Sequence, residues 1–164
     1  MTGPNEKLIY AGMMTDSLKK KKEILQKLLA QTEEQEALLS SEEMDVDRFE
    51  ALLDEKGKGI DELNKIDDGF DNLFGKMEAE FKSDPGAYAD DIKIMKKLIG
   101  DVTDLGTKIQ VIEKKNNDRF QKYLTTERQK LRESNRSQQT AMTYLQNMNG
   151  YHKPGDSYFV NETK

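Results

Sequence analysis

Cysteine and tryptophan are both absent from this 164-residue chain, which also has only three prolines and one histidine. Without cysteine the chain forms no disulfide, no thiolate metal site and no thiol-based redox centre. The single histidine, His152, cannot supply the two Glu-x-x-His pairs of a di-iron helical bundle. We therefore expect no cofactor and no metal ion, and we predict that the protein is not an enzyme.

Two short fragments resemble ligand-binding loops but lack the residues that such loops require. Asp45 and Asp47 have the spacing that opens an EF-hand, but Phe49, Glu50 and Lys56 occupy positions that need an oxygen ligand, a glycine and a glutamate. Gly75-Lys76 resembles the end of a phosphate-binding loop, but Met77 stands where a magnesium-binding Ser or Thr is needed. Neither fragment predicts a site.

Long apolar runs are also lacking, since none approaches the roughly 18 residues of a membrane-spanning helix. The N-terminus has no basic region followed by an apolar one, so we expect a cytoplasmic protein without stable membrane insertion. A net charge of -5 disfavours nucleic acid as the principal partner. The run Lys19–Lys22 could contact anionic lipid, but we favour a solvated helix face, because four consecutive residues cover all sides of a helix.

Charged residues are abundant and make up 35% of the chain. Leucine, isoleucine and methionine dominate the apolar residues and recur at the spacing of a helix. Apolar residues recur in steps of three and four in three stretches, which predict helices near residues 5–39, 46–82 and 87–124. The stripe of the first stretch consists of Met14, Leu18, Leu25, Leu28 and Leu39, with Lys21, Thr32 and Gln35 at polar positions. The second consists of Phe49, Leu52, Ile60, Leu63, Ile66, Phe70, Leu73, Met77 and Phe81. The third consists of Tyr88, Met95, Leu98, Val102, Leu105, Ile109, Ile112, Phe120 and Leu124.

The three stretches are nearly equal in length, about 55 Å each at 1.5 Å per residue. We predict an all-α fold, an antiparallel three-helix bundle of long helices over residues 1–124, in which the second and third helices form a hairpin. Asp45 or Asp47 is expected to cap the second helix, and Ser83-Asp84-Pro85-Gly86 to end it. Glycines at 57, 59, 69 and 75 are read as tolerated positions, some of which allow a neighbouring helix to approach.

The helical signal continues beyond the apolar stripe. Residues 125–139 contain no helix breaker and only one apolar residue, Leu131, so a core cannot hold them. We predict a projecting C-terminal helical arm over 125–149 and a flexible, disordered tail over 150–164, in which Pro154 and Gly155 prevent helix continuation. The predicted partner-binding residues are the apolar ones of the arm and tail: Leu124, Leu131, Met142, Tyr144, Leu145, Met148, Tyr158, Phe159 and Val160.

The stretch MDVDRFEALLDEKGKGIDELNKIDDGFDNLF resembles the second-helix signature of flagellar export chaperones of the FlgN type. The resemblance is carried by an acidic cap, leucine-rich spacing, a Glu-Lys pair and a closing phenylalanine: Asp45, Phe49, Leu52, Leu53, Glu55, Lys56, Ile60, Leu63, Asp67 and Phe70. The ending KPGDSYFVNETK is also similar to the tails of Gram-positive members, with Ser157, Phe159 and Val160 at matching places.

The resemblance implies a cytoplasmic chaperone that binds the terminal helical segments of hook-filament junction proteins, prevents their premature association and delivers them to the flagellar type III export gate or its ATPase complex. Two alternatives stay open at this point. One is an export chaperone for the filament cap or filament subunits, and the other is a structural coiled-coil adaptor without a client. A homodimer is also left open by the sequence.

Overall fold

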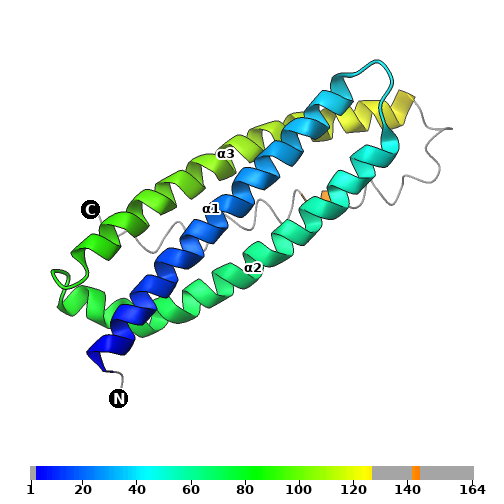
Figure 1. Cartoon of the computed structure of the whole chain (residues 1–164). Helices are drawn as coiled ribbons and strands as arrows, with labels where there is room; N and C mark the ends of the chain where they lie inside the picture. The colour runs from blue at the N-terminus through cyan, green and yellow to red at the C-terminus, as the bar shows by residue number, and fades with distance from the viewer. Residues whose placement is uncertain (1–2, 127–141, 145–164) are drawn as a thin grey trace.

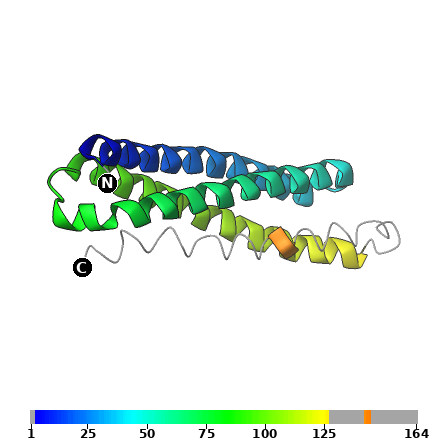
Figure 2. The ribbon, with the colours of Figure 1, turned by 90° about the horizontal axis from the view of Figure 1, so that it is seen from below.

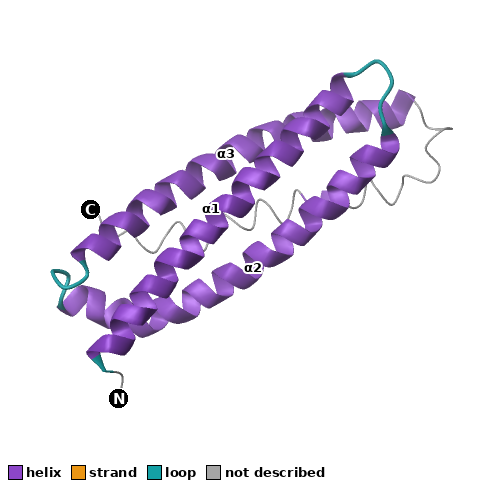
Figure 3. Cartoon of the chain, viewed as in Figure 1, coloured by secondary structure: helices purple, strands orange, loops and turns teal. Residues whose placement is uncertain are grey.

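The computed structural model describes residues 3–126 and 142–144, and it contains three long helices joined by short connections. They are α1 (Pro4–Ser40, 37 residues), α2 (Val46–Ser83, 38 residues) and α3 (Ala89–Thr126, 38 residues). The chain reverses direction at both connections, so the predicted antiparallel bundle of long helices is confirmed (Figures 1 and 3). The helix α3 also continues without interruption through Asn116, Asn117 and Asp118.

Local sequence determines where the helices begin and end. Pro4 opens α1, where its missing N–H leaves no helical hydrogen bond unmade. Asp45 is the N-cap of α2, and its Oδ1 accepts a hydrogen bond from the Arg48 backbone N–H at 3.1 Å. Asp84 follows α2, and its carbonyl oxygen accepts from the Ala87 N–H at 3.3 Å in the turn before α3. That turn delays the start of α3 to Ala89, two residues later than the sequence pattern predicted.

The helices are not equivalent in their packing. α1 lies between the other two and packs against both, whereas no Cα of α2 lies within 8 Å of a Cα of α3 (Figure 1). The sequence predicted a closely paired hairpin of α2 and α3; the structure instead pairs each of them with α1. Side chains therefore have to fill a gap between α2 and α3 on the side away from α1.

The predicted apolar stripes form the core. Most of the residues in the three stripes are buried, and they divide into three clusters along the bundle. The cluster near the turn between α2 and α3 contains Met14, Phe70, Phe74, Met77, Phe81 and Met95. The central cluster contains Leu25, Leu28, Ile60, Leu63, Val102, Ile109 and Tyr144. The cluster near the loop between α1 and α2 contains Met44, Phe49, Leu53 and Phe120.

Glycines do not play one common role in α2. A Cβ added at Gly59 would lie 3.3 Å from Leu28 Cδ2, so this position permits the close approach of α1. Gly57, Gly69 and Gly75 have open space where a Cβ would stand. Only Gly59 thus fits the expectation that these glycines allow a neighbouring helix to approach.

Candidate functional site

Aromatic pairs bridge the gap between α2 and α3 at its two ends. Near the loop between α1 and α2, the rings of Phe49 and Phe120 stack with centroids 4.9 Å apart. Near the other end, Phe81 meets Tyr88 edge to face at 5.4 Å. Aromatic pairs in these geometries stabilise a contact beyond the apolar area that they bury. The two ends of the gap are therefore closed by apolar contacts from α2 and from α3 or the turn before it.

Polar side chains meet in the middle of the bundle instead. Five of them, from all three helices, are almost completely buried, and we call this set the polar layer: Thr32 and Gln35 of α1, Lys56 of α2, and Glu113 and Asn116 of α3. Glu113 and Asn116 continue the steps of three and four that run from Ile109 to Phe120. The polar layer thus occupies core positions of the helical repeat.

Hydrogen bonds connect the members of the polar layer. Lys56 Nζ forms an ion pair with Glu113 Oε1 across the gap, and it donates to Gln35 Oε1 at 2.6 Å. Thr32 Oγ1 donates to the same Glu113 oxygen at 3.1 Å, and Asn116 Nδ2 donates to the Thr32 carbonyl oxygen at 3.1 Å. Buried charges require such partners, because an unpaired charge in a core loses its solvation without compensation.

Two polar atoms of the layer have no hydrogen-bond partner within the part of the chain that the structure describes. They are Gln35 Nε2, which can donate, and Asn116 Oδ1, which can accept. The other amide atom of each residue is engaged, with Lys56 and Thr32 respectively, which fixes the orientation of both amides. The polar layer consequently retains an unused donor and an unused acceptor.

The C-terminal part of the chain reaches this layer through Tyr144. The short described segment Met142–Tyr144 lies near α3 (orange in Figure 2), and Tyr144 is only 3% exposed. Its ring lies over the ion pair, with Lys56 Nζ 4.1 Å from the ring centroid. Met142 instead points outward, 41% exposed, with its Sδ 4.0 Å from Gln121 Nε2 of α3. Tyr144 therefore covers the middle of the gap between α2 and α3.

Burial dominates the electrostatics of this site. It lowers the pKa of Lys56 from the ordinary value of 10.5, and the negative charge and hydrogen bond of Glu113 oppose that shift. Burial also raises the pKa of Tyr144, and the charge of Glu113 raises it further. The ring hydroxyl consequently stays neutral, and Lys56 interacts with the face of the ring as well as with Glu113.

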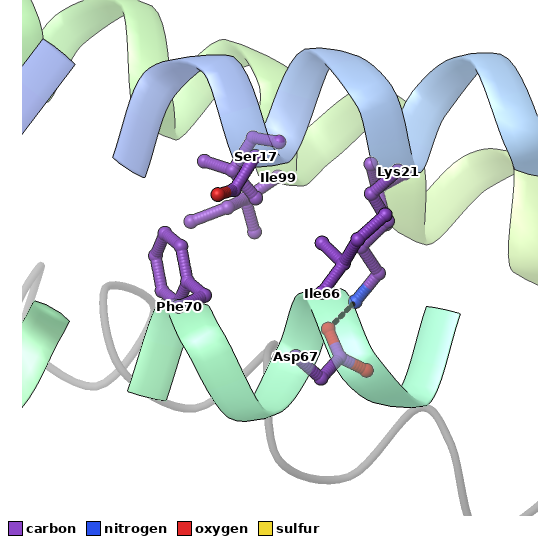
Figure 4. A pocket seen from close by; sticks show the side chains of 8 residues that line it. Ser17, Lys21, Ile66, Asp67, Phe70 and Ile99 are labelled. Atoms are coloured by element: carbon purple, nitrogen blue, oxygen red, sulfur yellow. Dashed lines mark hydrogen bonds and ion pairs between the residues drawn. The ribbon is translucent and has the colours of Figure 1, made fainter. Parts of the chain in front are cut away.

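A small pocket lies among the three helices, nearer than the polar layer to the turn between α2 and α3 (Figure 4). All three helices line it, through Ser17, Leu18, Lys21, Ile66, Asp67, Phe70, Ile99 and Val102. Lys21 Nζ and Asp67 Oδ1, 3.0 Å apart, form an ion pair at one side of the pocket. Val102 belongs both to this lining and to the central cluster, and it lies 11 residues along α3 from Glu113, about 16 Å of helix.

Ion pairs with α2 and α3 also show how the four lysines of the run Lys19–Lys22 in α1 are placed. Lys21 is buried against Asp67, and Lys22 Nζ lies 3.0 Å from Asp101 Oδ2 of α3. Lys19 and Lys20 are exposed. The run therefore does not form one continuous basic surface, and half of it serves to hold α1 to its neighbours.

Within residues 3–126 and 142–144, no group of acidic residues and histidine could hold a metal ion. In the same part of the chain, none of the helices has a stretch apolar enough to cross a membrane.

The predicted partner-binding residues divide into three groups. Leu124 is partly buried and packs against the cluster of Met44, Phe49 and Phe120. Met142 is exposed and Tyr144 is buried, so the segment lies against the bundle at this point. The remaining ones lie outside the described residues: Leu131, Leu145, Met148, Tyr158, Phe159 and Val160.

A comparison with models of protein families shows which family the chain belongs to. The model of the FlgN protein family matches residues 13–150, which include most of α1, all of α2 and α3, and the Met142–Tyr144 segment. The chain belongs to the FlgN family. FlgN proteins are flagellar export chaperones and not enzymes, so the family agrees with the absence of catalytic motifs from the sequence. Comparison with curated proteins and with solved structures gave no match.

The FlgN match ends at residue 150, so the tail from Tyr151 onward lies outside it. The similarity of Ser157, Phe159 and Val160 to family endings consequently stays a prediction. The chain is thus a chaperone of flagellar export, and the polar layer with Tyr144 lies inside the region that the family model covers.

Proposed function

We propose that this FlgN-family chaperone acts in the cytoplasm on hook-filament junction proteins, prevents their premature association and delivers them to the flagellar type III export gate. The observation that carries the proposal is the family match over residues 13–150. The three-helix architecture supports it, because α2 and α3 leave a gap that is bridged only by side chains. An added helix can lie along such a gap and complete a four-helix arrangement.

The client segment that fits this role is an amphipathic helix. Burying its apolar face against the bundle contributes about 25 cal/mol per Å2 of apolar area. A terminal segment that is disordered when free is ordered on binding, which lowers the net affinity and permits release at the export gate. The chaperone would thus keep the assembly helices of its client covered until export.

The apolar residues of the C-terminal segment are proposed to contribute to client binding, together with the bundle. Met142 is the described residue that supports this, because it presents an exposed thioether beside Gln121. Leu124, Leu131, Leu145 and Met148 complete the proposed contacts, and Tyr144, also predicted to bind the partner, is buried against the bundle in the free chain. Replacing the exposed Met142 with Gln should weaken client binding without lowering the melting temperature, whereas an unchanged dissociation constant would remove Met142 from the contact surface.

Co-purification tests the proposed function most simply. The tagged chain, expressed with each hook-filament junction protein of the source organism, should yield a soluble 1:1 complex in size-exclusion chromatography with light scattering. A complex formed only with the filament cap or filament-subunit protein would identify a chaperone with a different client. Self-association without any client complex would favour the structural adaptor, and would also reveal whether the chain forms a homodimer.

Delivery is proposed to depend on the tail residues Tyr158, Phe159 and Val160, which can dock as a short extended segment on the export gate or its ATPase complex. Replacing all three with Ser should reduce export of the client and leave its affinity for the chaperone unchanged. Tighter client binding by this variant would instead indicate that the tail covers the client site. An effect on neither property would leave the tail without a role in delivery.

A further inference from the structure

The gap between α2 and α3 is closed in two different ways. At its ends, Phe49–Phe120 and Phe81–Tyr88 close it with residues of α2, α3 and the turn between them. In its middle, Tyr144 covers it, and Tyr144 belongs to neither helix. Removing the ring from the middle of the gap therefore requires no movement of α2 or α3 along their lengths.

In the middle of the gap, some buried polar atoms lack hydrogen-bond partners even when Tyr144 is in place. Gln35 Nε2 and Asn116 Oδ1 are buried without a hydrogen-bond partner among the described residues. A buried polar atom without a partner has lost its hydrogen bonds to water without compensation, which destabilises this arrangement. An occupant that carries a polar side chain beside its apolar one can satisfy these atoms and compete with Tyr144.

We propose that the Tyr144 site, between α2 and α3 over the Lys56–Glu113 ion pair, is where an amphipathic client helix inserts, and that Tyr144 must leave this site for the client to bind. This inference rests on the proposed chaperone function and specifies its binding surface. In the free chain the Tyr144 ring thus occupies the position that an apolar side chain of the client would occupy in the complex.

The pocket, which α2 and α3 line with Ile66, Phe70, Ile99 and Val102, indicates a second contact position for the client. Ile66 lies ten residues along α2 from Lys56, which corresponds to about 15 Å of helix, and Phe70 lies about one turn beyond it. A client helix in the gap would therefore place two large apolar side chains about 11 or 14 residues apart, one at each position. Such spacing keeps both on the same helical face.

Each of the two positions for a client side chain has an ion pair beside it. Lys56 with Glu113 lies below the first, and Lys21 with Asp67 lies beside the second. Each pair is internally neutralised, so the gap attracts a client by apolar contact and by hydrogen bonds to Gln35 and Asn116 rather than by net charge. Salt should consequently change the client affinity little.

The absence of cysteine from the chain permits a direct test by crosslinking. Gln121→Cys with Met142→Cys places two thiols where Gln121 and Met142 now meet on the outer surface, outside the Tyr144 site. Linking them with a short bismaleimide holds Tyr144 in its site. The matched control is the same double variant with both thiols blocked by N-ethylmaleimide, so that both forms carry the same loss of the Met142 thioether and differ only in the crosslink. The probe is a recombinant hook-filament junction protein of the source organism, with affinity measured by calorimetry.

The linked chain should bind this probe at least about tenfold more weakly than the blocked control, since only the released state accepts the client. Equal affinity of the two forms would overturn the inference while leaving the chaperone function intact. If the linked, blocked and unmodified chains all fail to bind, the proposed function fails as well. The two failures are thus distinguishable in one experiment.

A substitution provides the second arm. Tyr144→Ala should increase the affinity for the probe by about tenfold, because it removes the competitor, and Tyr144→Phe, which keeps the ring over Lys56, should stay near the original affinity. Circular dichroism verifies that both variants retain their helices. Unchanged or weaker binding by a folded Tyr144→Ala chain would contradict the inference, as would its conversion into a dimer that excludes the probe.

Discussion

The aromatic ends of the bundle and its polar layer solve the same packing problem with opposite chemistry. At the ends, rings such as Phe49 with Phe120 bridge α2 and α3 through contacts that need no exact partner. In the middle, Lys56 crosses the same gap only because Glu113 and Gln35 accept its hydrogens. Apolar packing tolerates small shifts, whereas a buried ion pair loses most of its stabilisation when one partner is removed. We infer from this difference that the aromatic ends stabilise the contact between α2 and α3, whereas the polar layer restricts the two helices to one relative arrangement.

Removing a ring from the apolar cluster toward the turn between α2 and α3 should have the largest effect on stability. Phe70 is buried among Phe74, Met77 and Met95, so Phe70→Ala should lower the free energy of unfolding by about 3 to 5 kcal/mol. Chemical denaturation followed by circular dichroism measures this loss. A loss below about 1 kcal/mol would show that this end does not stabilise the bundle through close packing.

Breaking the ion pair should have the next largest effect. Lys56→Met leaves Glu113 buried with only the Thr32 hydroxyl, which should cost about 3 kcal/mol. The double variant Lys56→Met with Glu113→Leu removes both charges and should recover most of this loss, to within about 1 kcal/mol of the original chain. If the double variant is as unstable as the single one, the layer stabilises the fold through more than charge pairing.

The pH dependence of stability should identify the buried lysine. Since its folded pKa is lowered below 10.5, the unfolded chain binds more protons at this residue, and stability rises with pH through the window between the two values. The slope cannot exceed about 1.4 kcal/mol per pH unit. The pKa of the Tyr144 hydroxyl is raised on folding, so ionisation of this residue in the unfolded chain opposes the trend only as the pH approaches about 10.

The control for the pH experiment is the double variant Lys56→Met with Glu113→Leu, which lacks both groups of the pair but keeps Tyr144. Urea denaturation of both chains from about pH 8 to about pH 10 should show the original chain gaining stability relative to this control. A constant difference over that range would mean that burial does not shift the pKa of Lys56.

The smallest expected effect concerns the glycines beside Lys56. Gly57 faces open space, so Gly57→Ala should stabilise the chain by about 1 kcal/mol through helix propensity. At Gly59 the new Cβ would stand 3.3 Å from Leu28 Cδ2, and the gain should be reduced or lost. Thermal melts of the two variants compare them directly. Equal stabilisation would show that α1 and α2 can separate slightly at this point.

The sequence predicted the fold well because the spacing of apolar residues carries most of the information. All three helices were placed within two residues of their bounds at every described end except the C-terminal end of α3, which the pattern left open. The central position of α1 was not predicted. Its inward face is wide because it contacts two helices, but part of that face consists of small or polar residues such as Ala11, Thr15 and Gln31. Apolar periodicity underestimates such a face.

The site was harder to predict because its members are charged or polar. Lys56 and Glu113 belong to residue types that are normally solvated, so hydrophobicity places them outside the core. Position does reveal them: 109, 113, 116 and 120 keep the steps of three and four on α3. Thr32 and Gln35 were recognised at core positions of α1 by this rule. Extending it to α2 and α3 would have located the whole layer.

The contact between Tyr144 and the bundle could not be read from periodicity. Tyr144 lies beyond a stretch with almost no apolar residues, and the pattern there predicts a projecting arm. The contact depends on the gap between α2 and α3, which is a property of the tertiary packing. A single aromatic ring over a buried lysine leaves no repeat in the sequence.

The most direct test follows the Tyr144 ring itself in the full-length chain. The chain contains six tyrosines, so uniform 3-fluorotyrosine labelling should give six fluorine resonances, and the one missing from Tyr144→Phe identifies Tyr144. Adding a hook-filament junction protein of the source organism should move this resonance from its buried position to that of a solvent-exposed tyrosine. If the client binds and the Tyr144 resonance keeps its buried position, the client does not replace Tyr144 between α2 and α3.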